Sequence, residues 1–315
     1  MTKRQSSDHL LRRYQAGEHE AVWAEMMALG AEVREPPYFK DARAVAAETM
    51  RRARHNVELL IRRLDQLQYR FEIPKPPARQ FVLPTIEERI AKMRREQTKL
   101  SPTGLDQLEG MMRRQDAERR EKAARQAEQD AKKRAITDHL TDKSVFSAID
   151  PRFVKRIPAM EKKGFFLPLS LRAWIEEVGH VCLIGAHPTL SFFEGAGFPG
   201  IYTDPFMMLP DPYELQGWLE EAKGSKEIPS LDAVVGWTAE AKARLAVANE
   251  QLDYGYAIML PNPAADAPLK GERHGLTFVE YLRIVFRCGG FPGWERQDKR
   301  PEGELKFLSD GLLPI

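Results

Sequence analysis

The sequence predicts an α+β protein, in which a helical N-terminal region precedes a compact mixed α+β domain with a small, mainly antiparallel sheet. Apolar residues recur every three or four positions over residues 41–67, which is the period of an amphipathic helix. After Ser144, short apolar runs of strand length mix irregularly with helical segments, and this order favours α+β over a doubly wound parallel sheet. We therefore divide the chain into a helical region (1–83), a charged insertion (84–143) and an α+β domain (144–315).

The N-terminal region is expected to contain three helices. Helical spacing over residues 8–29 is interrupted at Gly17, which predicts two short helices. Asp41 is the expected N-cap of a third, long helix that runs to Leu67. This helical region ends at Pro74, Pro76 and Pro77, because each proline removes a backbone donor.

The insertion has a different composition. Residues 113–134 contain many alanines, arginines, lysines and glutamates and almost no large apolar side chain. Strong helix formers without an apolar face indicate a solvated or partly disordered helix. The sequence leaves open whether residues 85–140 are ordered.

The elements expected in the α+β domain have recognisable ends. Pro168 is expected to open a helix, Asp211 to cap a second with Glu214 as the capping-box acid, and Thr277 to cap a third with Glu280 in the same role. A short helix is expected over residues 301–308. The predicted strands are residues 181–184, 206–209, 234–238 and 254–260.

Composition narrows the class of protein. The 48 basic residues nearly balance the 46 acidic ones, so the chain lacks the overall field of a dedicated nucleic-acid binder. The arginines of the helix at 41–67 are interrupted by acids, which indicates a solvated helix face. Two cysteines in apolar stretches indicate a reducing compartment, and no signal peptide or membrane-spanning run is apparent. We expect a cytoplasmic protein without membrane or nucleic-acid partners.

Several segments resemble known proteins. The stretch LPLSLRAW at 167–174, followed by EEVG at 176–179, resembles the opening helix of the SUKH superfamily. A strand ending in LP at 260–261, a turn through Asp266 and a TFVEYL helix at 277–282 are also similar, so the likeness covers roughly residues 160–290. The resemblance implies a small α+β fold and, because many members are immunity proteins of bacterial toxin systems, a cognate toxin as partner.

The chain is also similar to an uncharacterised group of bacterial proteins. The shared segments are ARHN at 53–56, LPNPAADA at 260–267 and RCGGFPG at 287–293. This resemblance implies no particular activity.

Residues with catalytic or metal-binding chemistry are few. His180, Cys182 and His187 are of types that bind zinc or form a nucleophile, but no further ligand pair with the usual spacing accompanies them. We therefore expect no metal, no cofactor and no catalytic residue. The alternative is a hydrolase, which requires at least two of His180, Cys182, Asp204 and His274 to meet in a concave pocket.

The leading hypothesis is a non-enzymatic protein-binding module. Exposed tryptophans beside acids are typical of protein interfaces. We expect an acidic and aromatic partner-binding surface that includes Glu176, Glu177, Asp204, Trp237 and Trp294. A further alternative is a scaffold that self-associates through the helix at 41–67.

Overall fold

The α+β class predicted from sequence is confirmed. The computed structural model describes residues 9–71, 110–111, 145–185, 206–222, 228–237, 255–272, 274–292 and 302–315. The chain divides into one compact unit formed by Met1–Lys75 and Ser144–Ile315 and a second formed by Pro76–Lys143. The sequence divides residues 1–83 from 144–315, whereas in the structure these segments share one apolar core that runs from Leu10 to Ile315.

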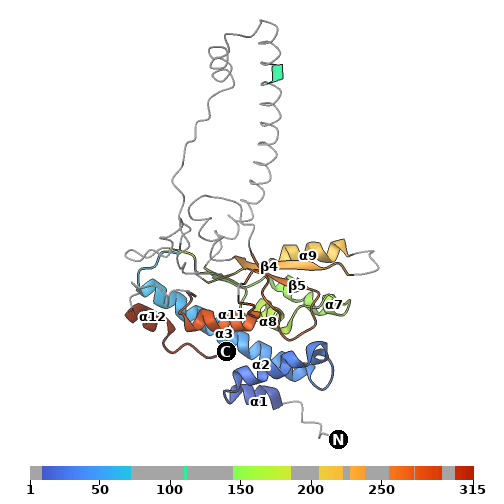
Figure 1. The fold of residues 1–315 in the computed structure, drawn as a ribbon, viewed down its shortest axis with the longest axis horizontal. Helices are drawn as coiled ribbons and strands as arrows, with labels where there is room; N and C mark the ends of the chain where they lie inside the picture. The colour runs from blue at the N-terminus through green and yellow to red at the C-terminus, as the bar shows by residue number, and fades with distance from the viewer. Residues whose placement is uncertain are drawn as a thin grey trace. The chain divides into compact units, whose positions relative to one another are not determined.

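The first unit is built mainly of helices around small sheets (Figure 1). Its helices are α1 (His9–Gln15), α2 (His19–Ala28), the 3-10 helix η1 (Gly30–Arg34), α3 (Phe39–Gln66), α6 (Pro151–Val154), α7 (Ile157–Glu161), α8 (Leu169–Glu177), α9 (Pro212–Glu221), α11 (Phe278–Arg287) and α12 (Glu302–Ser309). Its strands are β1 (Phe146–Ser147), β2 (His180–Cys182), β3 (Met207–Met208), β4 (Leu231–Trp237) and β5 (Gly255–Leu260).

The two short helices predicted before residue 30 are present as α1 and α2. They separate at Gly17, whose φ of +105° lies in the left-handed region that favours glycine. Asp41 was expected to cap α3, but α3 begins before it, at Phe39. Its carboxylate instead accepts hydrogen bonds from the backbone N–H groups of Leu10 (2.6 Å) and Leu11 (3.2 Å). Asp41 therefore caps α1 from a separate helix.

The long helix α3 is the centre of the unit. Its apolar stripe was predicted correctly: Val45, Met50, Val57 and Leu60 are fully buried. In Figure 1, α8, α11 and α12 lie along α3, and α1 packs against it as well. This stripe is therefore buried in the protein's own core.

The expected mainly antiparallel sheet is also confirmed. β1, β2 and β3 form one antiparallel sheet, and β4 and β5 form another. A hydrogen bond from Leu209 N to Val235 O (2.7 Å) joins the end of β3 to β4. The two strands β4 and β5 alternate: one face is buried through Ala233, Val235, Ile258 and Leu260, and the other points outward.

Asp266 joins the N-termini of two helices. It lies in the turn expected from the sequence, and its side chain is buried. Its carboxylate accepts from Ser170 Oγ (2.6 Å) in the first turn of α8 and from Val279 N (3.0 Å) in the first turn of α11. Burial raises the pKa of Asp266, and the hydrogen bonds oppose this. The capping box predicted for Thr277 and Glu280 is present at α11.

Candidate functional site

Three exposed apolar side chains lie on α9 and on the two strands β4 and β5, where β4 contacts both of the other elements. Tyr213, in the first turn of α9, is 75% exposed; Met259 on β5 is 63% exposed and Val234 on β4 is 38% exposed. Asp232 pairs with Met259 in the β4–β5 register and lies two residues from Val234, so these three residues share the outward face of the sheet. We call Tyr213, Glu214, Asp232, Val234 and Met259 the α9–β4–β5 surface.

Glu214 holds α9 against the sheet. Asp211 caps α9 as predicted, since its side chain accepts from Tyr213 N. Glu214 was expected to complete a capping box, but its carboxylate accepts instead from Val234 N on β4 (3.2 Å). This bond ties the first turn of α9, which carries Tyr213, to β4.

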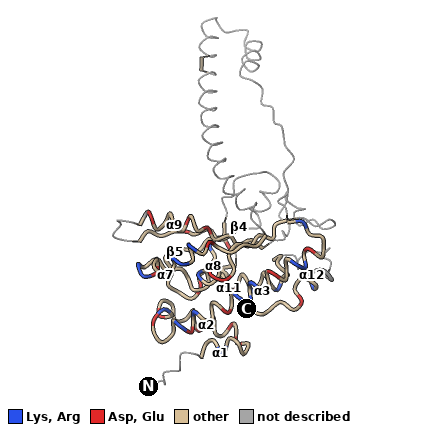
Figure 2. The backbone as a smooth tube through the Cα atoms, turned by 180° about the vertical axis from the view of Figure 1, so that it is seen from behind, with Lys and Arg blue, Asp and Glu red and all other residues tan. Residues whose placement is uncertain are grey.

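The α9–β4–β5 surface is acidic. Residues 206–222 and 228–237 contain Asp211, Glu214, Glu220, Glu221 and Asp232 but neither lysine nor arginine. Figure 2 shows acidic positions along α9. Asp232 is paired with Lys270, which bridges to β5. The described parts of α9 and β4 therefore carry acidic but no basic side chains beside the exposed apolar ones.

Glu214 is expected to make stability depend on pH near neutrality. Burial, opposed by the Val234 bond and assisted by Asp211, raises its pKa from 4.5 to about 7. A raised folded-state pKa means that its contribution is full below pH 4.5 and is lost as the pH rises through about 7. Glu214→Gln keeps the neutral form, so its urea midpoint should rise relative to the wild type across this interval. Glu220→Gln, on the same helix, controls for charge removal, and parallel pH curves for Glu214→Gln and the wild type would refute the assignment.

The predicted partner-binding residues are only partly described. Glu176 and Glu177 lie at the C-terminal end of α8 and are half-buried. Glu176 pairs with Arg172 (2.9 Å) and with Arg43 of α3 (3.5 Å), and the carbonyl of Glu177 accepts from Arg54 (3.3 Å). Both acids are thus held against α3.

The structure does not describe the side chains of the other predicted partner-binding residues. Trp237 ends β4, where it pairs with Gly255, and its side chain lies outside the described residues, as do Asp204 and Trp294. Tyr213 and Met259 were missed because periodicity assigns a residue to one face of an element but does not show whether that face is covered.

The histidines and cysteine of the hydrolase hypothesis occupy different settings. His180 is buried in β2, and its Nε2 lies 2.9 Å from the carbonyl oxygen of Pro210. Cys182 is half-buried in the same strand, whereas His274 is exposed. His187 and Asp204 lie outside the described residues. Within the described part of the chain, no three histidine, cysteine or acidic residues are grouped as metal ligands.

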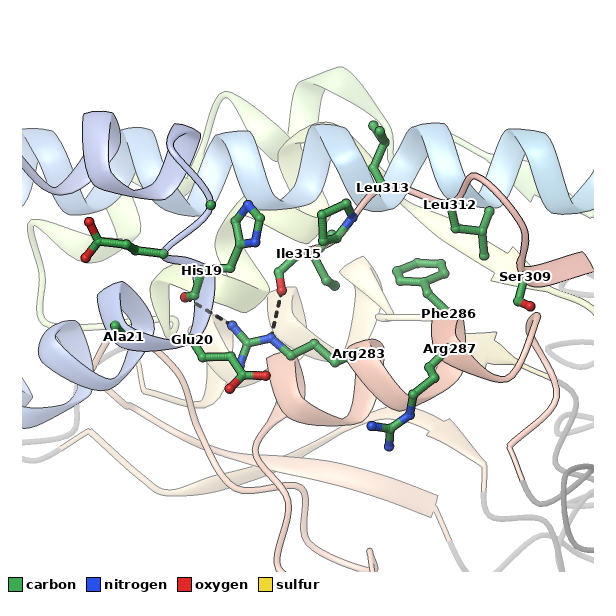
Figure 3. A pocket seen from close by; sticks show the side chains of 13 residues that line it. His19, Glu20, Ala21, Arg283, Phe286, Arg287, Ser309, Leu312, Leu313 and Ile315 are labelled. Atoms are coloured by element: carbon green, nitrogen blue, oxygen red, sulfur yellow. Dashed lines mark hydrogen bonds between the residues drawn. The ribbon is translucent and has the colours of Figure 1, made fainter. Parts of the chain in front are cut away.

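A pocket lies away from these residues, between α2, α11 and the segment after α12 (Figure 3). Its volume is about 490 Å³. It is lined by residues 17–21 of the α1–α2 turn and α2, by Arg283, Phe286 and Arg287 of α11, and by Ser309 and residues 312–315. His180, Cys182 and His274 are not among the lining residues.

Polar and basic side chains of α3 bind the C-terminal segment that forms one wall of this pocket. Asn56 makes a reciprocal pair with the backbone of Leu313, accepting at 2.7 Å and donating at 2.8 Å. Arg52 donates to the carbonyl of Pro314 (3.2 Å) and Arg63 to that of Leu308 (2.9 Å). The sequence indicated a solvated arginine face, but Arg52 and Arg63 bind the last residues of the described chain.

Comparison of the chain with protein-family models, with curated proteins and with solved structures finds no match in any of the three. Among the described helices, none has the length and apolar character needed to cross a bilayer.

Proposed function

We propose that the protein is a non-enzymatic, cytoplasmic binding module for another protein, and that its partner is a bacterial toxin which it neutralises. The observation that carries the proposal is the exposure of Tyr213 and Met259 on adjoining elements. Soluble proteins seldom expose large apolar side chains together unless they contact a partner. The toxin as partner rests on the resemblance of residues 160–290 to the SUKH superfamily.

The chemistry of the surface indicates the chemistry of the partner. Aromatic and methionine side chains are enriched at the centres of protein interfaces, where charged side chains form the rim. On the α9–β4–β5 surface we assign the central role to Tyr213 and Met259, and Asp211, the N-cap of α9, supplies negative charge beside Tyr213. The expected partner presents an apolar patch surrounded by lysines and arginines, and the complex buries on the order of 1,600 Å². Binding would inhibit the toxin by covering its active site.

The partner-binding residues predicted from the sequence are secondary in this proposal. Trp237 ends the strand that carries Val234, and it remains a proposed contact residue from the sequence. Glu176 and Glu177 lie on α8, where their interactions with α3 orient them. Asp204 and Trp294 remain proposed contact residues from the sequence alone.

Tyr213→Ala is expected to weaken the complex with the product of the adjacent gene by at least about thirtyfold, because central aromatic residues often contribute 2 kcal/mol or more. Isothermal titration calorimetry measures the affinity, and co-expression measures rescue of growth. Tyr38→Ala is the matched control, since Tyr38 is also exposed (39%) but lies at the start of α3. Equal loss of affinity in both variants, or an adjacent gene product that neither binds nor inhibits growth, would contradict the proposal.

A further inference from the structure

We propose that the pocket between α2, α11 and residues 309–315 is a binding site for a small organic monocarboxylate with an apolar body. Its volume of about 490 Å³ falls within the range usual for small-molecule sites. Figure 3 shows three segments, far apart in sequence, that converge on it. The site is independent of the α9–β4–β5 surface, because none of its lining residues belongs to α9, β4 or β5.

Arg283 supplies a fixed positive charge. Its Nε donates to the carbonyl of Ile315 (2.7 Å) and its Nη2 to the carbonyl of His19 (3.2 Å), as the dashed lines in Figure 3 show. These two main-chain oxygens fix the orientation of the guanidinium at the edge of the pocket. Its remaining N–H groups can form the charge-assisted hydrogen bonds that arginine makes with carboxylates.

Arg287 adds a second positive charge one turn further along α11. Its side chain is exposed and also lines the pocket. Among the described residues, no carboxylate forms an ion pair with Arg283 or with Arg287. Two arginines of one helix therefore line the same pocket, and guanidinium groups bind carboxylates well.

The opposite wall is formed by the start of α2. Burial first, and then the charges of Arg52 and Arg283, lower the pKa of His19, so this imidazole disfavours a further proton. His19 opens α2, and the preceding Glu18 makes no side-chain cap; its carboxylate pairs with Arg13 instead. Hence the first turn of α2 presents the positive end of its dipole to the same space.

The remaining lining selects the kind of anion. Phe286, Leu312 and Leu313 form apolar walls, which suit a hydrocarbon body. Glu18 and Glu20 also line the pocket, and their charges repel a dianion more strongly than a monoanion. A monocarboxylate therefore fits better than inorganic phosphate.

The test uses sodium hexanoate, its neutral analogue hexanamide and inorganic phosphate as probes, with binding to the full chain measured by calorimetry. Hexanoate should bind at least about tenfold more tightly than hexanamide, because the charge-assisted hydrogen bonds require the carboxylate. Arg287→Gln should weaken hexanoate binding by a similar factor. Arg54→Gln is the matched control, since Arg54 is an exposed arginine on α3 outside the pocket.

Each outcome decides the assignment. Preference for hexanoate that is lost in Arg287→Gln and kept in Arg54→Gln supports it, provided that the urea midpoint shows Arg287→Gln to be folded. Equal binding of hexanoate and hexanamide, tighter binding of phosphate, or no detectable binding of hexanoate would overturn it. None of these results depends on a toxin partner, so failure here leaves the proposed protein interface unaffected.

Discussion

Glu161→Gln is expected to lower the free energy of unfolding by about 3–5 kcal/mol, the cost of leaving buried charges without their partner. The Glu161 carboxylate lies between two arginines: it accepts from Arg34 Nη1 at 3.0 Å and from Arg172 Nη1 through its other oxygen. The side chains of Arg34, Glu161 and Arg172 are only 8%, 8% and 3% exposed. Water cannot replace the lost charge, so equilibrium unfolding in urea should show a large shift.

Arg34 makes this effect larger than that of a simple ion pair. Its guanidinium also donates to the carbonyls of Pro263 (2.8 Å) and Leu167, and it packs over the ring of Phe166. Burial lowers the pKa of Arg34, and Glu161 opposes that shift. Removing the carboxylate therefore leaves a costly buried cation that ties η1 to the rest of the unit.

Glu58→Gln provides the matched control for Glu161→Gln. Glu58 pairs with Arg54 on the surface of α3, with side chains 43% and 49% exposed. Because exposed pairs are screened by water, this change should alter stability by no more than about 0.5 kcal/mol. If the two variants lost similar stability, the buried network would not have the role that its geometry indicates.

The sequence predicted the elements whose signals are local. The helix α3 and the capping box of α11 depend on residues within one or a few turns, so periodicity and capping rules sufficed. Acidic residues with the same local pattern could not be assigned from the sequence. Asp41 and Glu214 resemble caps of their own helices, but their carboxylates bind α1 and β4 instead. A helix-start signal does not identify which backbone groups a carboxylate will reach.

The candidate sites required long-range information. The pocket joins residues near 19 to residues near 283 and 315, and the network joins Arg34 to Glu161 and Pro263. Each contact crosses more than a hundred residues, and no periodicity within either segment encodes it. The sequence divided residues 1–83 from 144–315 for the same reason. The change in composition identifies the insertion between them, but it does not show that the two flanking segments pack together.

The second large effect is expected at Asp266, where substitution by alanine should cost about 3 kcal/mol or more, because buried donors on two helices lose their acceptor. Ser170 Oγ and Val279 N would be left facing an apolar environment at the N-termini of α8 and α11. Both helices also lose the negative charge near the positive ends of their dipoles. Urea unfolding measures the loss, and circular dichroism shows whether helix content falls with it.

Asp266→Asn separates the shape of the side chain from its negative charge. The amide oxygen can accept from Val279 N while the NH₂ group donates to the hydroxyl oxygen of Ser170, so mainly the negative charge is removed and the stability should lie between those of the wild type and Asp266→Ala. Asp211→Ala is the control for capping alone, since Asp211 caps a single helix and is not fully buried. It should cost about 1 kcal/mol. An Asp266→Ala penalty no larger than that of Asp211→Ala would show that the α8–α11 junction is held by apolar packing around Trp174 and Phe278 rather than by the shared carboxylate.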